Sequence, residues 1–165
     1  MNKVSSLVLA AALSVAATAH AADRLQIQAV LTKDGQVLST QTQEVGPGET
    51  AHFSKTQSKE YDGKATVSSK GTNVEKEVYD LGLTADVTPK VLSTGKVQLT
   101  VKGQYTEPLS KNEVKAAPGV TLNLPHFSTY SLNHIVTADQ DGKATIGPDE
   151  GKGPNVQLDL TVKRL

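Results

Sequence analysis

Hydrophobic and polar residues alternate along most of the chain with a period of two. The alternation is clearest in four segments, at residues 25–32, 81–88, 97–102 and 156–163. Successive side chains of a β-strand point to opposite faces, so each segment is predicted to be a strand with one buried face and one solvent-exposed face. This pattern is typical of antiparallel sheets, because strands of parallel sheets are usually buried on both faces.

Short turn sequences separate the alternating segments. Most of them carry a glycine where a positive φ is needed, which is typical of tight turns between strands. They are KDGQ (33–36), GPGE (46–49), YDGK (61–64), STGK (93–96), APG (117–119) and QDGK (140–143). A further stretch rich in glycine and proline, at 147–154, is predicted to be a loop.

The segments on either side of STGK predict a hairpin that contributes to the core. Its buried face is expected to hold the odd-numbered hydrophobic residues Leu83, Ala85, Val87, Val97, Leu99 and Val101. Together the patterns predict an all-β fold of about ten strands, either an antiparallel sandwich or a partly closed barrel. The best helical candidate after residue 21, at 110–117, is one or two turns long at most. The first and last strands have similar patterns and are expected to be edge strands or partners of each other.

The N-terminus has the features of a secretory signal peptide. Lys3 supplies the positive charge, residues 7–17 form a short apolar core, and Ala19-His20-Ala21 fits a cleavage site. We expect cleavage after residue 21, which leaves a single all-β domain at 22–165. The alternative is a retained anchor or an amphipathic helix, but the alanine-rich end and the polar residues that follow favour cleavage. A periplasmic or secreted bacterial protein is therefore predicted.

Composition and charge limit the function further. The mature segment would hold 144 residues, 16 basic and 17 acidic, because the leader removes one lysine and no acid. This balance is unlike the basic surface of a nucleic-acid-binding protein. The chain has no cysteine, which excludes disulfides, thiolate metal sites and a lipid-anchored lipoprotein. No second apolar run reaches the length of a membrane-spanning helix.

Candidate catalytic and metal-binding residues are isolated. His52, His126 and His134 are too far apart in sequence for two of them to share one strand face. Glu75 and Glu77 share a strand face, and glycosidases use such paired carboxylates, but the chain has no tryptophan to line a sugar cleft. Serine and threonine occur without a nucleophile motif, and no glycine-rich loop precedes a helix. We therefore predict a non-enzymatic protein with no catalytic residues, cofactor or metal.

The few aromatic residues include one local cluster. His126, Phe127 and Tyr130 lie close together in sequence and are predicted as a possible partner surface. The alternative is that these rings fill the ends of the core.

The order of several short motifs resembles a known family. A segment with small residues at 48–51 precedes a strand at 82–89, a glycine turn and the VQLTV strand at 97–101, and DGKATIG follows at 141–147. This order resembles the C-terminal homology domain of the secretins of bacterial type II and type III secretion, over most of residues 45–147. Secretins usually carry Gly-Gly-Leu after the last turn, whereas this chain has Gly147-Pro148-Asp149.

Two functional hypotheses follow. The first is an exported cell-envelope protein that acts by binding or structural assembly, through a protein partner or self-association at its sheet edges. The second, which the resemblance implies, is a secretin-like strand subunit of an outer-membrane oligomer.

Overall fold

The computed structural model describes residues 24–69, 71–139, 141–147 and 155–165. The predicted leader at 1–21 and most of the predicted loop at 147–154 lie outside the described residues. The described part of the chain forms nine β-strands, close to the predicted number. They are β1 (Leu25–Lys33), β2 (Gln36–Val45), β3 (Ala51–Ser68), β4 (Gly71–Val91), β5 (Val97–Ala117), β6 (Val120–Ser131), β7 (His134–Ala138), β8 (Lys143–Ile146) and β9 (Val156–Arg164).

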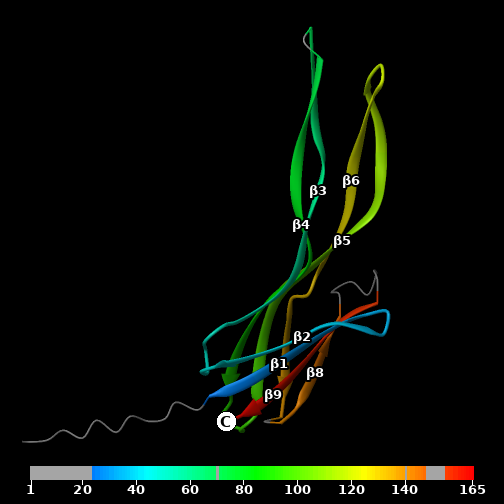
Figure 1. Ribbon diagram of the computed structural model, residues 1–165. Coiled ribbons are helices and arrows are strands. Elements are labelled where there is room, and N and C mark those ends of the chain that lie inside the picture. The colour runs from blue at the N-terminus through cyan, green and yellow to red at the C-terminus, as the bar shows by residue number, and fades with distance from the viewer. Residues whose placement is uncertain (1–23, 70, 140, 148–154) are drawn as a thin grey trace, which may run out of the picture.

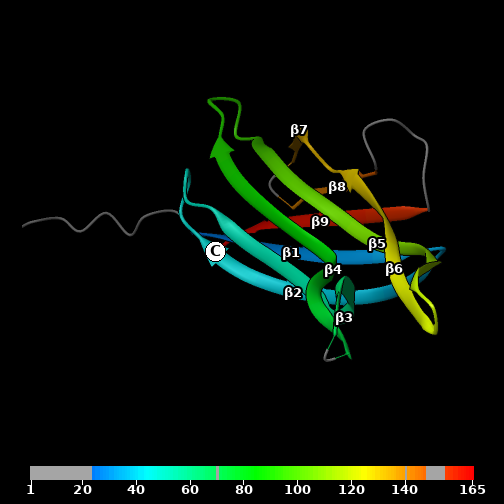
Figure 2. The ribbon, with the colours of Figure 1, turned by 90° about the horizontal axis from the view of Figure 1, so that it is seen from above.

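The strands form two open antiparallel sheets that pack face to face (Figure 2). The first sheet has the order β2-β1-β9-β8, and the second has the order β3-β4-β5-β6 with β7 also paired to β5. The predicted all-β antiparallel sandwich is thus confirmed. The first and last strands are partners, because β1 pairs with β9 along its whole length, from Leu25 opposite Arg164 to Lys33 opposite Val156.

The core lies between the sheets and is built from the alternating residues that the sequence predicts. All six predicted core residues of the hairpin from 81 to 103 are buried, and they share one cluster with the inward residues of β1 and β9. The most deeply buried side chains from both sheets, each with less than 2% of its surface exposed, include Leu25, Ile27, Leu99, Val101, Leu158 and Leu160. Burial of this apolar surface, at about 25 cal/mol per Å², is the main stabilising contribution in a chain with few aromatic rings.

The second sheet, which we call the long sheet, extends far beyond the region in which the two sheets pack together. The ladder between β4 and β5 ends at the pair Gly82 and Thr106, and beyond it the strands separate as two long hairpins (Figure 1). We call residues 57–81 the β3–β4 arm and residues 107–128 the β5–β6 arm. The two arms rise side by side from the sandwich, and strand pairing within each arm continues almost to its tip.

Most of the predicted turns are confirmed, with one exception. The sequences KDGQ, GPGE, STGK and APG lie at or contain turns between strands, and in QDGK the N–H of Gly142 donates to the carbonyl oxygen of Asp139. The prediction of a turn at YDGK was wrong, because residues 61–64 lie inside β3. The register shifts between Asp62 and Ala65, so one extra residue on β3 forms a bulge, and the hairpin turns only at its tip, after Ser68.

The segment at 110–117, the best helical candidate, is also strand, as the C-terminal part of β5. Its pairing with β6 overrides its weak helical pattern. Within the residues that the structure describes, no helix is long and apolar enough to cross a membrane.

Candidate functional site

The two outer strands of the long sheet are the candidate interaction site. In the described part of the chain, β3 pairs only with β4, and β6 pairs only with β5. An edge strand presents unpaired N–H and C=O groups, which another strand can use. Side chains of this same chain, however, already occupy part of each edge.

Two glutamines of β2 cover the lower part of the β3 edge. The side-chain amide of Gln43 accepts a hydrogen bond from the N–H of His52 at 3.1 Å and donates one to the carbonyl oxygen of the same residue. The amide of Gln41 does the same at Ser54, donating to its carbonyl oxygen at 2.6 Å and accepting from its N–H at 3.4 Å. We call Gln41 and Gln43 the glutamine clasp. It joins the edges of the two sheets without strand pairing.

A buried carboxylate covers part of the β6 edge. Asp62, at the bulge of β3, is 8% exposed and accepts a hydrogen bond from the N–H of Asn123 of β6 at 2.7 Å. The other oxygen of the same carboxylate accepts a hydrogen bond from Nζ of Lys76 of β4. The Asn123 N–H, followed by Lys76, holds the pKa of Asp62 below its ordinary value, because both favour the charged form. Asp62 therefore ties the β3–β4 arm to the β5–β6 arm.

Three aromatic rings, from β3, β4 and β6, pack between the same two arms. The ring of Phe127 lies 4.7 Å from that of Tyr79 and 5.6 Å from that of Tyr61, measured between centroids. Tyr61 and Tyr79 meet edge to face at 6.0 Å. The Tyr79 hydroxyl donates to Glu77, and this bond raises the pKa of Tyr79. Among the described residues no strand ladder joins the two arms, and the rings bury apolar surface there.

An ion pair fastens the sandwich to the base of the β5–β6 arm. Lys33, at the end of β1, pairs with Glu107 of β5, which lies one residue beyond the last β4–β5 pair. The Nζ of Lys33 also lies 5.9 Å from the centroid of the buried Tyr105 ring. The bond to Glu107 raises the pKa of Lys33, while burial raises the pKa of Tyr105.

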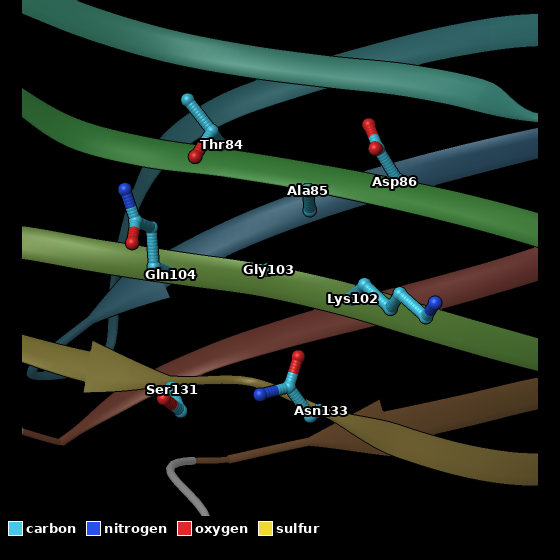
Figure 3. A pocket seen from close by; sticks show the side chains of 8 residues that line it. All are labelled: Thr84, Ala85, Asp86, Lys102, Gly103, Gln104, Ser131 and Asn133. Carbon is cyan, nitrogen blue, oxygen red and sulfur yellow. The ribbon is translucent and has the colours of Figure 1, made fainter.

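A shallow polar notch lies on the outer face of the long sheet (Figure 3). It forms where β6 ends and β7 begins along the same side of β5, with the N–H of Leu132 bonded to the carbonyl oxygen of Gly103. Its volume is about 320 Å³, and Gly103 lies at its centre. The other lining residues are Thr84, Ala85, Asp86, Lys102, Gln104, Ser131 and Asn133. These side chains offer hydrogen bonds, but the set contains no nucleophile beside a basic residue.

The three residues predicted as a partner surface do not share one environment. Phe127 packs against Tyr61 and Tyr79 between the arms, whereas Tyr130 packs against the hydrophobic core. They lie three residues apart on β6 and so face opposite sides of an extended strand. His126 is exposed. The partner surface on these residues stays a prediction.

The other candidate chemistry remains scattered. His52 pairs with Asp86 on the exposed face of the long sheet at 2.7 Å, and His134 bonds through Nε2 to the carbonyl oxygen of Gly147 at 2.8 Å. No group of three or more possible metal-binding side chains occurs among the described residues.

Sequence reasoning missed the residues that occupy the edges. Gln41, Gln43 and Asp62 look like exposed polar residues in the alternating pattern, and Asp62 looks like part of a hairpin turn. Their partners are backbone groups of other strands, which carry no sequence signal. Only the spacing of the two glutamines, which places both on one face of a strand, hints at a joint role.

Comparison with known proteins identifies the family. The family model of Secretin, described as bacterial type II and III secretion system protein, matches residues 29–147. The match runs from β1 to the end of β8 and so contains both arms, the glutamine clasp and Asp62. The chain belongs to the secretin family. The resemblance placed on most of residues 45–147 is thus confirmed, and the match begins earlier than the motifs suggested. The family description is that of bacterial type II and III secretion system proteins.

Solved secretin structures are similar to the chain as well. The secretin domain β-barrel of InvG from the Salmonella SPI-1 injectisome NC-base matches with a TM-score of 0.45 and 10% identity, over 87% of this chain and 59% of that one. The cryo-EM structure of the Salmonella SPI-1 type III secretion injectisome secretin InvG matches with a TM-score of 0.42 and 11% identity, over 86% of this chain and 58% of that one. The chain therefore spans less than two thirds of the length of either match. A search of the curated proteins found no match.

Proposed function

We propose that the chain is an exported, non-enzymatic structural subunit of a bacterial secretion system, which self-associates through the edges of its long sheet. The observation that carries the proposal is the secretin family match over residues 29–147, which contains the whole of that sheet. The predicted signal peptide supports export to the periplasm or the outer membrane.

The strand order supports self-association between identical copies. Across its width the long sheet holds four strands in the order β3-β4-β5-β6, with β7 in the place of β6 beside the first part of β5, and each strand is antiparallel to its neighbour. Because the number is even, β6 of one copy runs antiparallel to β3 of the next when the copies stand side by side. The antiparallel ladder can therefore continue from copy to copy in a head-to-tail arrangement.

A soluble binding module is the second candidate, and the polar notch around Gly103 favours it. Such a protein would act as a monomer or dimer in the periplasm, with the notch or the exposed sheet face as its contact surface. It needs no continuation of the long sheet.

Fractionation of the full-length chain expressed in a bacterial host tests the proposal. Periplasm and membranes are separated, and the mass of the species in each is determined by size exclusion with light scattering. Multimers in the membrane fraction that resist heating in detergent are expected. A periplasmic species of one or two copies, with none in the membrane, would contradict self-association and favour the binding module.

A further inference from the structure

Along the outer edge of β3, every second residue directs its backbone N–H and C=O away from β4. Side chains of the same chain already bond some of these groups. In an antiparallel ladder every second residue directs its N–H and C=O away from the partner strand. His52 and Ser54 do so, because the glutamine clasp bonds both groups of each residue. The register of β3 with β4 is unbroken from Ala51 to Asp62, so Thr56, Ser58 and Glu60 direct theirs outward as well.

The clasp imitates a neighbouring strand at only two positions. A glutamine amide carries both a carbonyl oxygen and N–H groups, as a peptide group does, and can therefore satisfy both outward groups of one residue. Gln43 lies against His52 and Gln41 against Ser54, so β2 runs antiparallel to β3. Continuing this order places Ser39 opposite Thr56. The Ser39 side chain is too short to reach the β3 backbone. The Ser39 hydroxyl instead accepts a hydrogen bond from the Gln41 side chain at 3.3 Å.

The upper limit of the accessible edge lies at Asp62. The register of β3 shifts between Asp62 and Ala65, which interrupts the outward alternation. The Asp62 side chain is directed to Asn123 of the other arm. Between the clasp and this bulge, the stretch Thr56–Glu60 remains as a regular ladder whose outward groups the clasp does not reach.

We propose that the glutamine clasp confines strand addition by a second copy of this chain to the stretch Thr56–Glu60 of β3, and so acts as a brake on self-association. The inference rests on the proposed function, because it names the surface through which the copies meet. A second copy fits because its β6 supplies an antiparallel strand that continues the same sheet. Release of the clasp extends the accessible edge down to His52, which adds the outward groups of two residues to the three already available.

Replacement of both glutamines tests this directly. In Gln41→Thr with Gln43→Thr, threonine keeps a strand-forming side chain but is too short to reach β3. The matched control is Gln26→Thr with Gln28→Thr on β1, which makes the same change in composition on a strand that pairs with β2 and β9 in the first sheet. Self-association of the full chain is measured by analytical ultracentrifugation over a concentration series.

The clasp variant is expected to associate at a concentration at least about tenfold lower than the wild type and the control, because one net hydrogen bond already corresponds to about a tenfold change and release exposes the outward groups of two residues. If the wild type and all variants associate alike, the brake is refuted and the proposed function stands. If none associates at any concentration, the proposed function fails, and the brake with it.

Amide hydrogen exchange of the wild-type monomer provides a second test that needs no variant. The clasp predicts slower exchange at the N–H of His52 and Ser54 than at the N–H of Thr56, Ser58 and Glu60. Exchange at His52 and Ser54 as fast as at Thr56 would overturn the inference, even if the clasp variant failed to fold.

Discussion

The carboxylate of Asp62 on β3 bonds to the backbone N–H of Asn123 on β6 at 2.7 Å, and so joins the two outer strands of one sheet within a single chain. The two residues lie in different arms, which have lost the β4–β5 ladder that holds them together lower down. Lys76 and the three rings of Tyr61, Tyr79 and Phe127 complete this contact. It holds the arms together through side chains, since no strand pairing joins the two arms within the part of the chain that the structure describes.

Acid is expected to weaken this contact between the arms. The pKa of Asp62 is lowered in the folded chain, chiefly by the Asn123 N–H and then by Lys76. The stabilisation is therefore fully present above the unfolded pKa of about 4, and it is lost as the pH falls through the folded value. As the pH is lowered below about 4, the melting temperature of the wild type should fall more steeply than that of Asp62→Asn, as measured by circular dichroism.

The control for this comparison is Glu113→Gln, which removes an exposed carboxylate from the β5–β6 arm. Its melting temperature should follow the wild-type pH dependence, because the other carboxylates are common to both proteins. Parallel curves for the wild type and Asp62→Asn would show that Asp62 does not stabilise the folded chain by this route.

The pair of Lys33 and Glu107 is expected to behave as a coupled unit. Only 13% of the Glu107 side chain is exposed, so removal of Lys33 leaves a largely buried charge without its partner. We expect Lys33→Met to lower the free energy of unfolding by about 1–3 kcal/mol. The double variant with Glu107→Gln should recover part of this loss, because it removes the unpaired charge as well.

Urea denaturation of the wild type, both single variants and the double variant gives the coupling energy. Additive losses in the double variant would mean that the two side chains do not interact across the base of the arm.

The alternation of hydrophobic residues predicted much of the fold because burial of one face is a local property of each strand. Leu99 and Val101 are buried as the pattern requires, and the pairing of β1 with β9 matches the similarity of their sequences. The prediction of a turn at YDGK was wrong, and the error has a physical cause. The same Asp-Gly pair serves a hairpin turn or a bulge, and only the pairing of the residues on either side distinguishes them.

The candidate site was harder to predict, because its contacts join side chains to the backbone of distant strands. Gln43 and His52 are close in sequence, but only the turn between β2 and β3 brings them together across two sheets. Phe127 was singled out as a partner residue, yet its neighbours Tyr61 and Tyr79 lie on another arm. The family resemblance predicted the class of protein, but it predicted none of these contacts.

Gly82 is expected to tolerate no side chain. It has a φ of +123° at the end of the β4–β5 ladder, and a Cβ there would lie 2.1 Å from the carbonyl oxygen of Lys55. We expect Gly82→Ala to reduce stability by about 1–3 kcal/mol through backbone strain, with a further loss from the displaced β3. Urea denaturation provides the measurement.

Gly48 gives a matched control for the effect of φ alone. It also has a positive φ, of +84°, but nothing lies within 4 Å of a Cβ at that position. Gly48→Ala should therefore cost less than Gly82→Ala. Equal losses would show that the close approach of Lys55 is not what restricts residue 82.

Leu99 is expected to be indispensable to the fold. It is fully buried, and its strand lies between β4 and β7, opposite Pro89 on one side and Val136 on the other. Leu99→Asp places a carboxylate among hydrophobic side chains with no cation to pair with it. The penalty of several kcal/mol is a large part of the total stability of a typical domain, about 5–15 kcal/mol. We expect loss of the cooperative thermal transition and rapid proteolysis.

Gln104→Asp is the control for Leu99→Asp, because it introduces the same carboxylate at an exposed position of the same strand. It should fold and melt near the wild type, within the range of about 0.5 kcal/mol typical of surface substitutions. An exported Leu99→Asp variant with normal thermal stability would contradict the placement of this residue between the two sheets. It would also mean that the hydrophobic face of the hairpin is not what holds the long sheet against the first sheet.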